Sequence, residues 1–177
     1  MRTNIIFWLF LLVLVSMFSS SNVGAVPNDK KKSVGNNGER QREYSEAVNA
    51  LKDQVFLLSL YSFVDNEGRM AGIEPEGNFI TVNKDKFMMQ KSAALVLTTF
   101  SGSDHMKGIL SDFKLKESKN GNIQFSFVMT DGDKSLIFKG KMNKGDNIIE
   151  GSIKGKKEER EISVSANIQP VKSHFNY

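Results

Sequence analysis

The stretch that decides the fold reads Lys119-Asn120-Gly121-Asn122-Ile123-Gln124-Phe125-Ser126-Phe127-Val128-Met129-Thr130-Asp131-Gly132-Asp133. Every second residue from Ile123 to Met129 is apolar, and the polar residues Asn122, Gln124 and Ser126 fall on the opposite face. This alternation predicts a β-strand with one buried face and one exposed face. An Asn-Gly pair before it and an Asp-Gly pair after it are typical of tight turns, so the stretch predicts a strand between two hairpins.

The same pattern continues along the chain in both directions. Upstream, Ile109, Phe113 and Leu115 are expected to share one face of the preceding strand. Downstream, three further strands are expected with one apolar face each, separated in part by the turn Lys144-Gly145-Asp146. Their apolar side chains are Leu136, Phe138, Met142, Ile149, Ile153, Ile162, Val164, Ala166 and Ile168.

The N-terminal half begins with a helical pattern. Tyr44, Ala47, Val48 and Leu51 are spaced by three and four residues, which predicts a short amphipathic helix over residues 40–51. After the helix the period changes to that of strands, which are expected at residues 54–64, 78–83 and 86–97. The first of these strands is apolar on both faces, so both faces are expected to be covered.

Together these segments predict a mainly β fold with one short N-terminal helix. Eight strands at regular spacing, without long helices between them, indicate an antiparallel meander. Because each strand has an apolar face to bury, the meander is expected to form a strongly curled sheet or a small barrel. Gly108, Gly140 and Gly151 lie within strand patterns, where a missing side chain permits a bulge or a sharp bend, and they favour curvature.

The first 25 residues predict a cleavable export signal. Arg2 precedes an apolar run from Ile5 to Phe18, and Val23, Gly24 and Ala25 are small residues of the kind that a signal peptidase reads. The run has about 14 residues, fewer than the roughly 20 that span a bilayer, so no membrane span is expected after cleavage. The expected organisation is a signal peptide at 1–25, a flexible linker at 26–39, one β-rich domain at 40–170 and a tail at 171–177.

The composition agrees with one exported globular domain. The chain has 177 residues, 40% hydrophobic and 25% charged, with a formal net charge of +4 from interleaved basic and acidic residues. It contains no cysteine, which excludes disulfides, thiolate metal sites and the lipid attachment of a bacterial lipoprotein. We therefore expect a periplasmic or secreted protein with a slight preference for anionic surfaces.

Two blocks of sequence resemble a known family. The first is Asn78-Phe79-Ile80-Thr81-Val82-Asn83-Lys84-Asp85, followed by Gln90, and the second is Gly108-Ile109-Leu110-Ser111-Asp112-Phe113-Lys114-Leu115 with the turn Lys119-Asn120-Gly121-Asn122. In pattern and order they are similar to the DUF4251 family, uncharacterised exported proteins of Bacteroidetes, over residues 48–170. The chain departs from the family at Asn83-Lys84-Asp85, where many members have Asp-Gly-Asp, and in a shorter loop near residues 101–107. The resemblance implies a bacterial envelope protein with a β-rich domain and no established activity.

No residue pattern predicts a catalytic or metal site. Ser103, Asp104 and His105 are adjacent in sequence, whereas a catalytic triad needs its groups to converge in space beside an oxyanion site. Asp131 and Asp133 lack the other ligands of a calcium loop, and a hairpin turn explains them. We therefore expect no enzyme activity, no cofactor and no metal, with an exported hydrolase as a minor alternative.

Lysines recur on the polar faces and turns of the C-terminal strands, where they could form a patch. They are Lys114, Lys116, Lys119, Lys139, Lys141, Lys144, Lys154, Lys156 and Lys157. Acidic residues lie between them, and export separates the protein from cellular nucleic acid. Nucleic-acid binding is therefore not expected.

Phe125, Phe127 and Phe138 share the inward phase of their strands, and their simplest role is in a packed core. An eight-stranded barrel is also just wide enough to hold one small ligand. Two functions remain open. The first is a non-catalytic exported protein of the cell envelope that binds a protein or glycan partner through strand faces or loops. The second is a lipocalin-like carrier of a small apolar molecule, with these three rings as ligand-binding residues.

Overall fold

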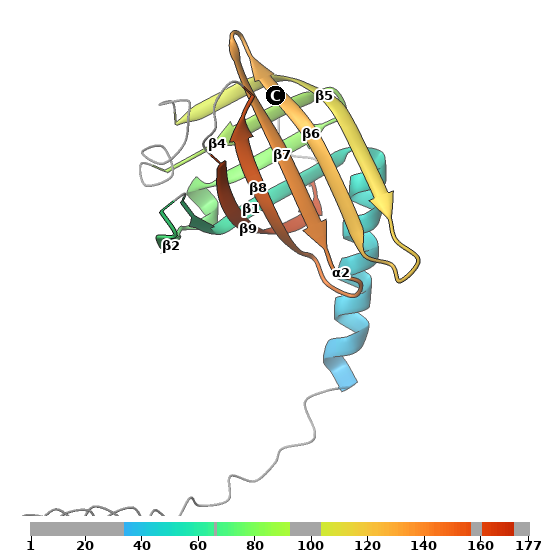
Figure 1. Cartoon of the computed structure of the whole chain (residues 1–177). Coiled ribbons are helices and arrows are strands. Elements are labelled where there is room, and N and C mark those ends of the chain that lie inside the picture. Colours follow the sequence, from blue (N-terminus) through green and yellow to red (C-terminus); the bar gives the residue numbers. More distant parts are fainter. Residues whose placement is uncertain (1–33, 66, 93–103, 157–160, 172–177) are drawn as a thin grey trace, which may run out of the picture. The chain divides into compact units, whose positions relative to one another are not determined.

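Nine strands form one antiparallel sheet in the part of the chain that the structure describes (Figure 1). The structure is a computed structural model, and it describes residues 34–65, 67–92, 104–156 and 161–171. Its elements in chain order are α2 (Val34–Asp53), β1 (Val55–Val64), β2 (Met70–Gly72), a 3-10 turn η1 (Pro75–Gly77), β3 (Phe79–Asn83), β4 (Lys86–Gln90), β5 (His105–Glu117), β6 (Ile123–Asp131), β7 (Lys134–Met142), β8 (Ile148–Gly155) and β9 (Glu161–Pro170).

The sheet closes on itself as a barrel of β1 and β3 to β9. Each strand from β3 to β8 pairs with the next one along the chain. Strand β1 pairs with β3 along the first half of one edge and with β9 along the other edge. Leu58, for example, lies opposite Ile80 on one side and Ile168 on the other. The predicted meander and its closure into a small barrel are confirmed. The short strand β2, which pairs with the last three residues of β1, was not expected.

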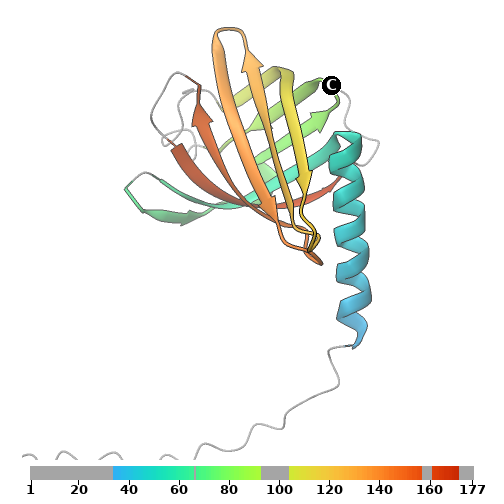
Figure 2. The ribbon, with the colours of Figure 1, turned by 45° about the vertical axis from the view of Figure 1, so that its right-hand side comes forward.

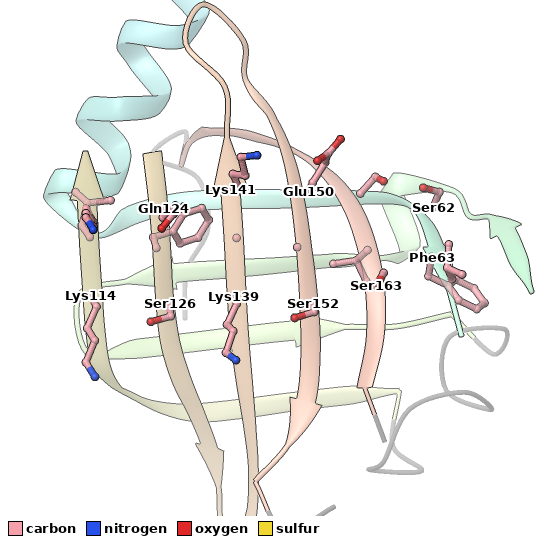
Figure 3. A pocket seen from close by; sticks show the side chains of 18 of the residues that line it. Ser62, Phe63, Lys114, Gln124, Ser126, Lys139, Lys141, Glu150, Ser152 and Ser163 are labelled. Atoms are coloured by element: carbon pink, nitrogen blue, oxygen red, sulfur yellow. The ribbon is translucent and has the colours of Figure 1, made fainter. Parts of the chain in front are cut away.

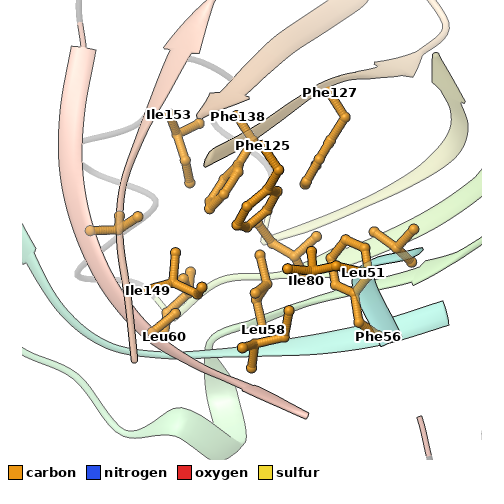
Figure 4. Close-up of a cluster of buried hydrophobic side chains, with 14 of the residues drawn as sticks. Leu51, Phe56, Leu58, Leu60, Ile80, Phe125, Phe127, Phe138, Ile149 and Ile153 are labelled. Carbon is orange, nitrogen blue, oxygen red and sulfur yellow. The ribbon is translucent and has the colours of Figure 1, made fainter. Parts of the chain in front are cut away.

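Apolar side chains fill the interior of the barrel. Leu58, Phe127, Phe138 and Ile153 are each at most 1% exposed. Figure 4 shows rings and aliphatic side chains meeting from opposite walls. Burial of one such side chain contributes roughly 1.5–3 kcal/mol. The alternation seen in the sequence of β6 to β9 is therefore the pattern of a barrel with one packed face.

Two glycines allow β7 and β8 to approach the aromatic rings of the core. Gly140 and Gly151 lie opposite each other in the ladder. A Cβ atom on Gly140 would lie 2.6 Å from Cζ of Phe125, and one on Gly151 would lie 2.7 Å from the carbonyl oxygen of Lys139 and 3.0 Å from Cζ of Phe138. Real Cβ atoms do not approach so closely, so only glycine permits this packing. Gly108 is in the same situation against the backbone of Thr130.

Strand β5 differs from its prediction at Ile109. A bulge near Asp112, which has a φ of 52°, shifts the alternation by one residue. Leu110 therefore faces the core and is 5% exposed, whereas Ile109 faces outward and is 64% exposed. The prediction that Ile109 shares a face with Phe113 and Leu115 was wrong, because strict alternation takes no account of an inserted residue.

Helix α2 packs its C-terminal half against one end of the barrel, and its N-terminal half extends past the strands (Figure 2). The predicted stripe from Tyr44 to Leu51 is buried. The Tyr44 hydroxyl donates a hydrogen bond to the carbonyl oxygen of Gly121, at 2.5 Å. The helix begins at Val34, earlier than predicted, because no apolar spacing marks the residues before Tyr44.

No helix in the described ranges is long and apolar enough to cross a membrane. The predicted signal peptide and the first residues of the predicted linker fall within residues 1–33, outside the described part of the chain. The strand expected at 86–97 ends at Gln90 in β4, earlier than predicted, and residues 93–97 fall outside the described part, as does the predicted tail beyond residue 171.

Candidate functional site

An open groove of about 920 Å³ crosses the outer face of the sheet (Figure 3). It runs over β5, β6, β7, β8 and β9 and reaches β1 and β2. The polar side chains that line it alternate with the core side chains of the same strands, so the groove lies outside the barrel. Its polar side chains are the exposed half of the alternation that defines the fold.

Two rows of side chains line the groove, because the register aligns outward-facing residues across neighbouring strands. One row is Lys114, Ser126, Lys139, Ser152, Ser163 and Val64. The other is Lys116, Gln124, Lys141, Glu150, Ser165 and Ser62. Neighbouring strands lie about 4.8 Å apart, so polar groups follow one another at about this spacing along most of each row.

The inward-facing glycines explain why the outer face is hollowed here. Gly140 and Gly151 border the groove from below. Because these residues carry no side chain, the backbone of β7 and β8 lies directly on the rings of Phe125 and Phe138. From this close approach we infer that the glycines let β7 and β8 lie deeper than side chains would allow, which hollows the outer surface here.

Positive charge gathers at one end of the groove. Lys114 and Lys116 on β5 and Lys139 and Lys141 on β7 are all exposed. In the described residues, none of these four ammonium groups forms an ion pair. Glu150 on β8 is the one carboxylate among the lining residues. We call these four lysines the lysine quartet.

The other end of the groove is neutral. Serine hydroxyls from β8, β9 and β1 line it, at Ser152, Ser163, Ser165 and Ser62. The groove ends at an apolar edge formed by Val64 and Met70, and Met70 is 75% exposed. A ligand in the groove would therefore meet cations, then hydroxyls, then an apolar contact.

The three predicted ligand-binding rings lie on the opposite face of the sheet. Phe125, Phe127 and Phe138 are at most 4% exposed. The ring centroids of Phe127 and Phe138 are 5.0 Å apart, and those of Phe125 and Phe138 are 5.6 Å apart. These are contact distances for aromatic rings, so the three residues pack on one another in the core. Only Phe125 also borders the groove.

The other residues considered for chemistry are not brought together. Asp104 and His105 are exposed neighbours with 3.5 Å between Oδ2 and Nε2, while Ser103 is outside the described residues. Asp131 accepts a hydrogen bond from the backbone amide of Lys107, at 3.3 Å. In the described ranges, no group of three or more histidine, cysteine, aspartate or glutamate side chains is placed to hold a metal ion.

A buried lysine lies at the barrel end away from α2. Lys91 follows β4 and is 2% exposed. The pKa of its amine is lowered from 10.5 to about 8, mainly by burial and in smaller part by the charge of Lys134, while the charge of Asp104 opposes the change. Its backbone amide donates a hydrogen bond to the carbonyl oxygen of Asp104. Lys91 is separate from the groove.

The lysines of this site were predictable from the sequence, and the serines were not. It placed the lysine quartet on polar faces that could form a patch, and the register now shows that these lysines flank β6. It did not single out Ser152 or Ser163. The signal was present as the polar phase of each strand, but only the register reveals which polar residues become neighbours.

Comparison with known proteins supports the predicted resemblance through a solved structure. No protein-family model matches the sequence, and no curated protein matches it. The structure is similar to the crystal structure of a DUF4251 family protein from Bacteroides eggerthii DSM 20697, with a TM-score of 0.65 and 25% sequence identity. The match covers 76% of this chain and 91% of that chain.

Proposed function

From this confirmed resemblance to the DUF4251 family, we propose that the protein is a non-catalytic exported protein of the cell envelope that binds a glycan in its outer groove. The observation that carries the proposal is the double row of hydroxyl, amide and ammonium groups across six neighbouring strands, β5 to β9 and β1. Such groups exchange hydrogen bonds with sugar hydroxyls, and an open groove admits a chain of sugars.

The composition of the groove favours a glycan over a protein partner. Protein interfaces are depleted in lysine, glutamate and serine and enriched in aromatic residues. The groove has the opposite composition: serines and lysines dominate its polar lining, and its two phenylalanines, Phe63 and Phe125, are almost fully buried.

The arrangement of carboxylates supports binding without hydrolysis. Most glycoside hydrolases use a pair of carboxyl groups on either side of the scissile bond. Glu150 has no second carboxylate beside it in the lining of the groove. An interior carrier function is less well supported, because the three candidate rings contact one another.

Binding of the purified protein to an array of oligosaccharides tests the proposal. We expect the double substitution Ser152→Ala and Ser163→Ala to weaken glycan binding about tenfold, since each lost hydrogen bond costs about 0.5–1.5 kcal/mol. Ser111→Ala is the matched control, because Ser111 is an exposed serine of β5 outside the groove. Absence of glycan binding, or binding that the double substitution leaves unchanged, would reject the proposal.

Export is part of the same proposal and has its own test. The apolar run at 5–18 and the small residues at 23–25 support it. We expect the mature protein in the periplasmic or secreted fraction, with Val26 as its first residue by mass spectrometry. A full-length protein that begins at Met1 in the cytoplasmic fraction would contradict export.

A further inference from the structure

The lysine quartet surrounds β6, near one end of the groove. Ser126 of β6 lies opposite Lys114 on one side and Lys139 on the other. Gln124 lies in the same way between Lys116 and Lys141. Two residues along a strand span about 7 Å and two strands span about 10 Å, so the four lysine Cα atoms mark the corners of a small rectangle.

Hydrogen-bond donors come from β6, between the lysines, as well as from the four lysines themselves. The Gln124 amide and the Ser126 hydroxyl project between the lysines, as Figure 3 shows. Lysine ammonium groups sit on flexible stems and bind as point charges, so several of them can turn toward one anion. Hydrogen bonds from a charged donor to a charged acceptor are about twice as strong as neutral ones.

Among the described residues that line the groove, Glu150 is the one with a negative charge, and of the four lysines it lies opposite Lys141 alone. The lysines form no ion pair there. Glu150 lies opposite Lys141 on the side away from β6, outside the rectangle. Four like charges at this spacing repel one another unless an anion lies between them, so an anion fits the space over Gln124 and Ser126.

We propose that the lysine quartet binds an anionic substituent of the glycan, a carboxylate or a sulfate or phosphate ester, and that the ligand is an acidic glycan. This inference rests on the proposed function. The anionic sugar lies over β5 to β7, and the neutral sugars that follow lie over the serines of β8, β9 and β1. The two ends of the groove thereby fix the direction of the bound chain.

The decisive probe is a sugar chain whose charge can be removed without changing its backbone. Oligogalacturonate carries a carboxylate on each sugar, and its methyl ester is neutral. A second pair, sulfated dextran and dextran, tests whether sulfate replaces carboxylate. Isothermal titration with the purified protein is expected to show at least tenfold tighter binding of each charged form than of its neutral partner.

Variants that remove charge from the lysine quartet test whether these lysines cause the preference for charged sugars. Lys114→Gln with Lys139→Gln is expected to weaken binding of the charged sugars at least tenfold and binding of the neutral sugars by a much smaller factor, because glutamine keeps a hydrogen-bond donor and loses only the charge. Lys86→Gln, at an exposed position of β4 outside the groove, is the matched control and is expected to have no effect. Circular dichroism and a thermal melt establish that each variant is folded.

The outcomes separate this inference from the proposed function. Equal binding of charged and neutral sugars, still weakened by the serine substitutions, would reject the acidic ligand and leave the glycan groove standing. Absence of binding to any sugar would reject both. If anionic lipid vesicles or single-stranded DNA compete as well as oligogalacturonate does, the quartet is a general anion surface and the assignment to a glycan is wrong.

Discussion

Gly140 shows at the scale of one residue how the core shapes the groove. A Cβ at this position would lie 2.6 Å from the ring of Phe125, so Gly140→Ala forces the ring or β7 to move. We expect the free energy of unfolding to fall by about 1–3 kcal/mol, the usual cost of overpacking. Urea denaturation measures it.

Gly77→Ala is the control for this prediction. A Cβ at Gly77 would have no atom within 4 Å, so the change is expected to stay within about 0.5 kcal/mol. Equal effects of the two substitutions would mean that contact with Phe125 is not what excludes a side chain at Gly140. Glycan binding should weaken in Gly140→Ala alone, because the groove becomes shallower.

Lys91 gives a prediction about pH. Its pKa is 10.5 in the unfolded chain and about 8 in the folded protein, so between these values the unfolded chain binds more protons. The contribution of Lys91 to stability is therefore least favourable below pH 8 and improves as the pH rises toward 10.5. The stability of the wild type relative to Lys91→Met is expected to increase by about 2 kcal/mol between pH 8 and pH 10.

Denaturation of both proteins in buffers from pH 7 to pH 10 measures this difference. Lys86→Met is the matched control, because Lys86 is exposed on the neighbouring strand β4. Its difference from the wild type should not change over the same range. A flat difference for Lys91→Met would show that the folded protein does not lower the pKa of Lys91.

At the scale of elements, one hydrogen bond joins helix α2 to the turn between β5 and β6. The Tyr44 hydroxyl donates to the carbonyl oxygen of Gly121, and burial together with the charge of Glu117 raises the pKa of the phenol above 10.0. Tyr44→Phe is expected to lower the free energy of unfolding by about 1 kcal/mol, because the carbonyl loses its donor. Tyr61→Phe, at a partly exposed position of β1, is the control, and an equal loss there would contradict the role of this bond.

The strands were predictable wherever alternation and turn residues agree. Asn120-Gly121, Gly132 and Gly145 mark three hairpins, and the three glycines have positive φ values in the structure. Prediction failed where the cause is not local. β2 has three residues and exists only because β1 extends past β3, and Ile109 faces outward because of the bulge near Asp112.

For the whole molecule, closure was predictable and the groove was not. Apolar faces on every strand require a barrel or another cover, and inward glycines allow the curvature. The groove depends on register: Lys114 lies opposite Ser126 only because the bulge in β5 inserts a residue between Ser111 and Lys114. If regular pairing continued from Ser111 without the bulge, Lys114 would lie opposite Phe125 and would not flank Ser126. No sequence pattern reports this register.

The pairing of β1 with β9 also determines when folding can be completed during synthesis of the chain. The barrel joins its first strand to its last, Phe56 to Pro170 at one end of the pair. Until the ribosome has made β9, one edge of β1 has no partner, and a strand edge of this length is a template for wrong pairing. Contacts between distant parts of a chain form slowly, because a long loop must close first. The protein therefore completes its fold only after synthesis of β9 is finished, and a chain cut short before that strand is expected to aggregate.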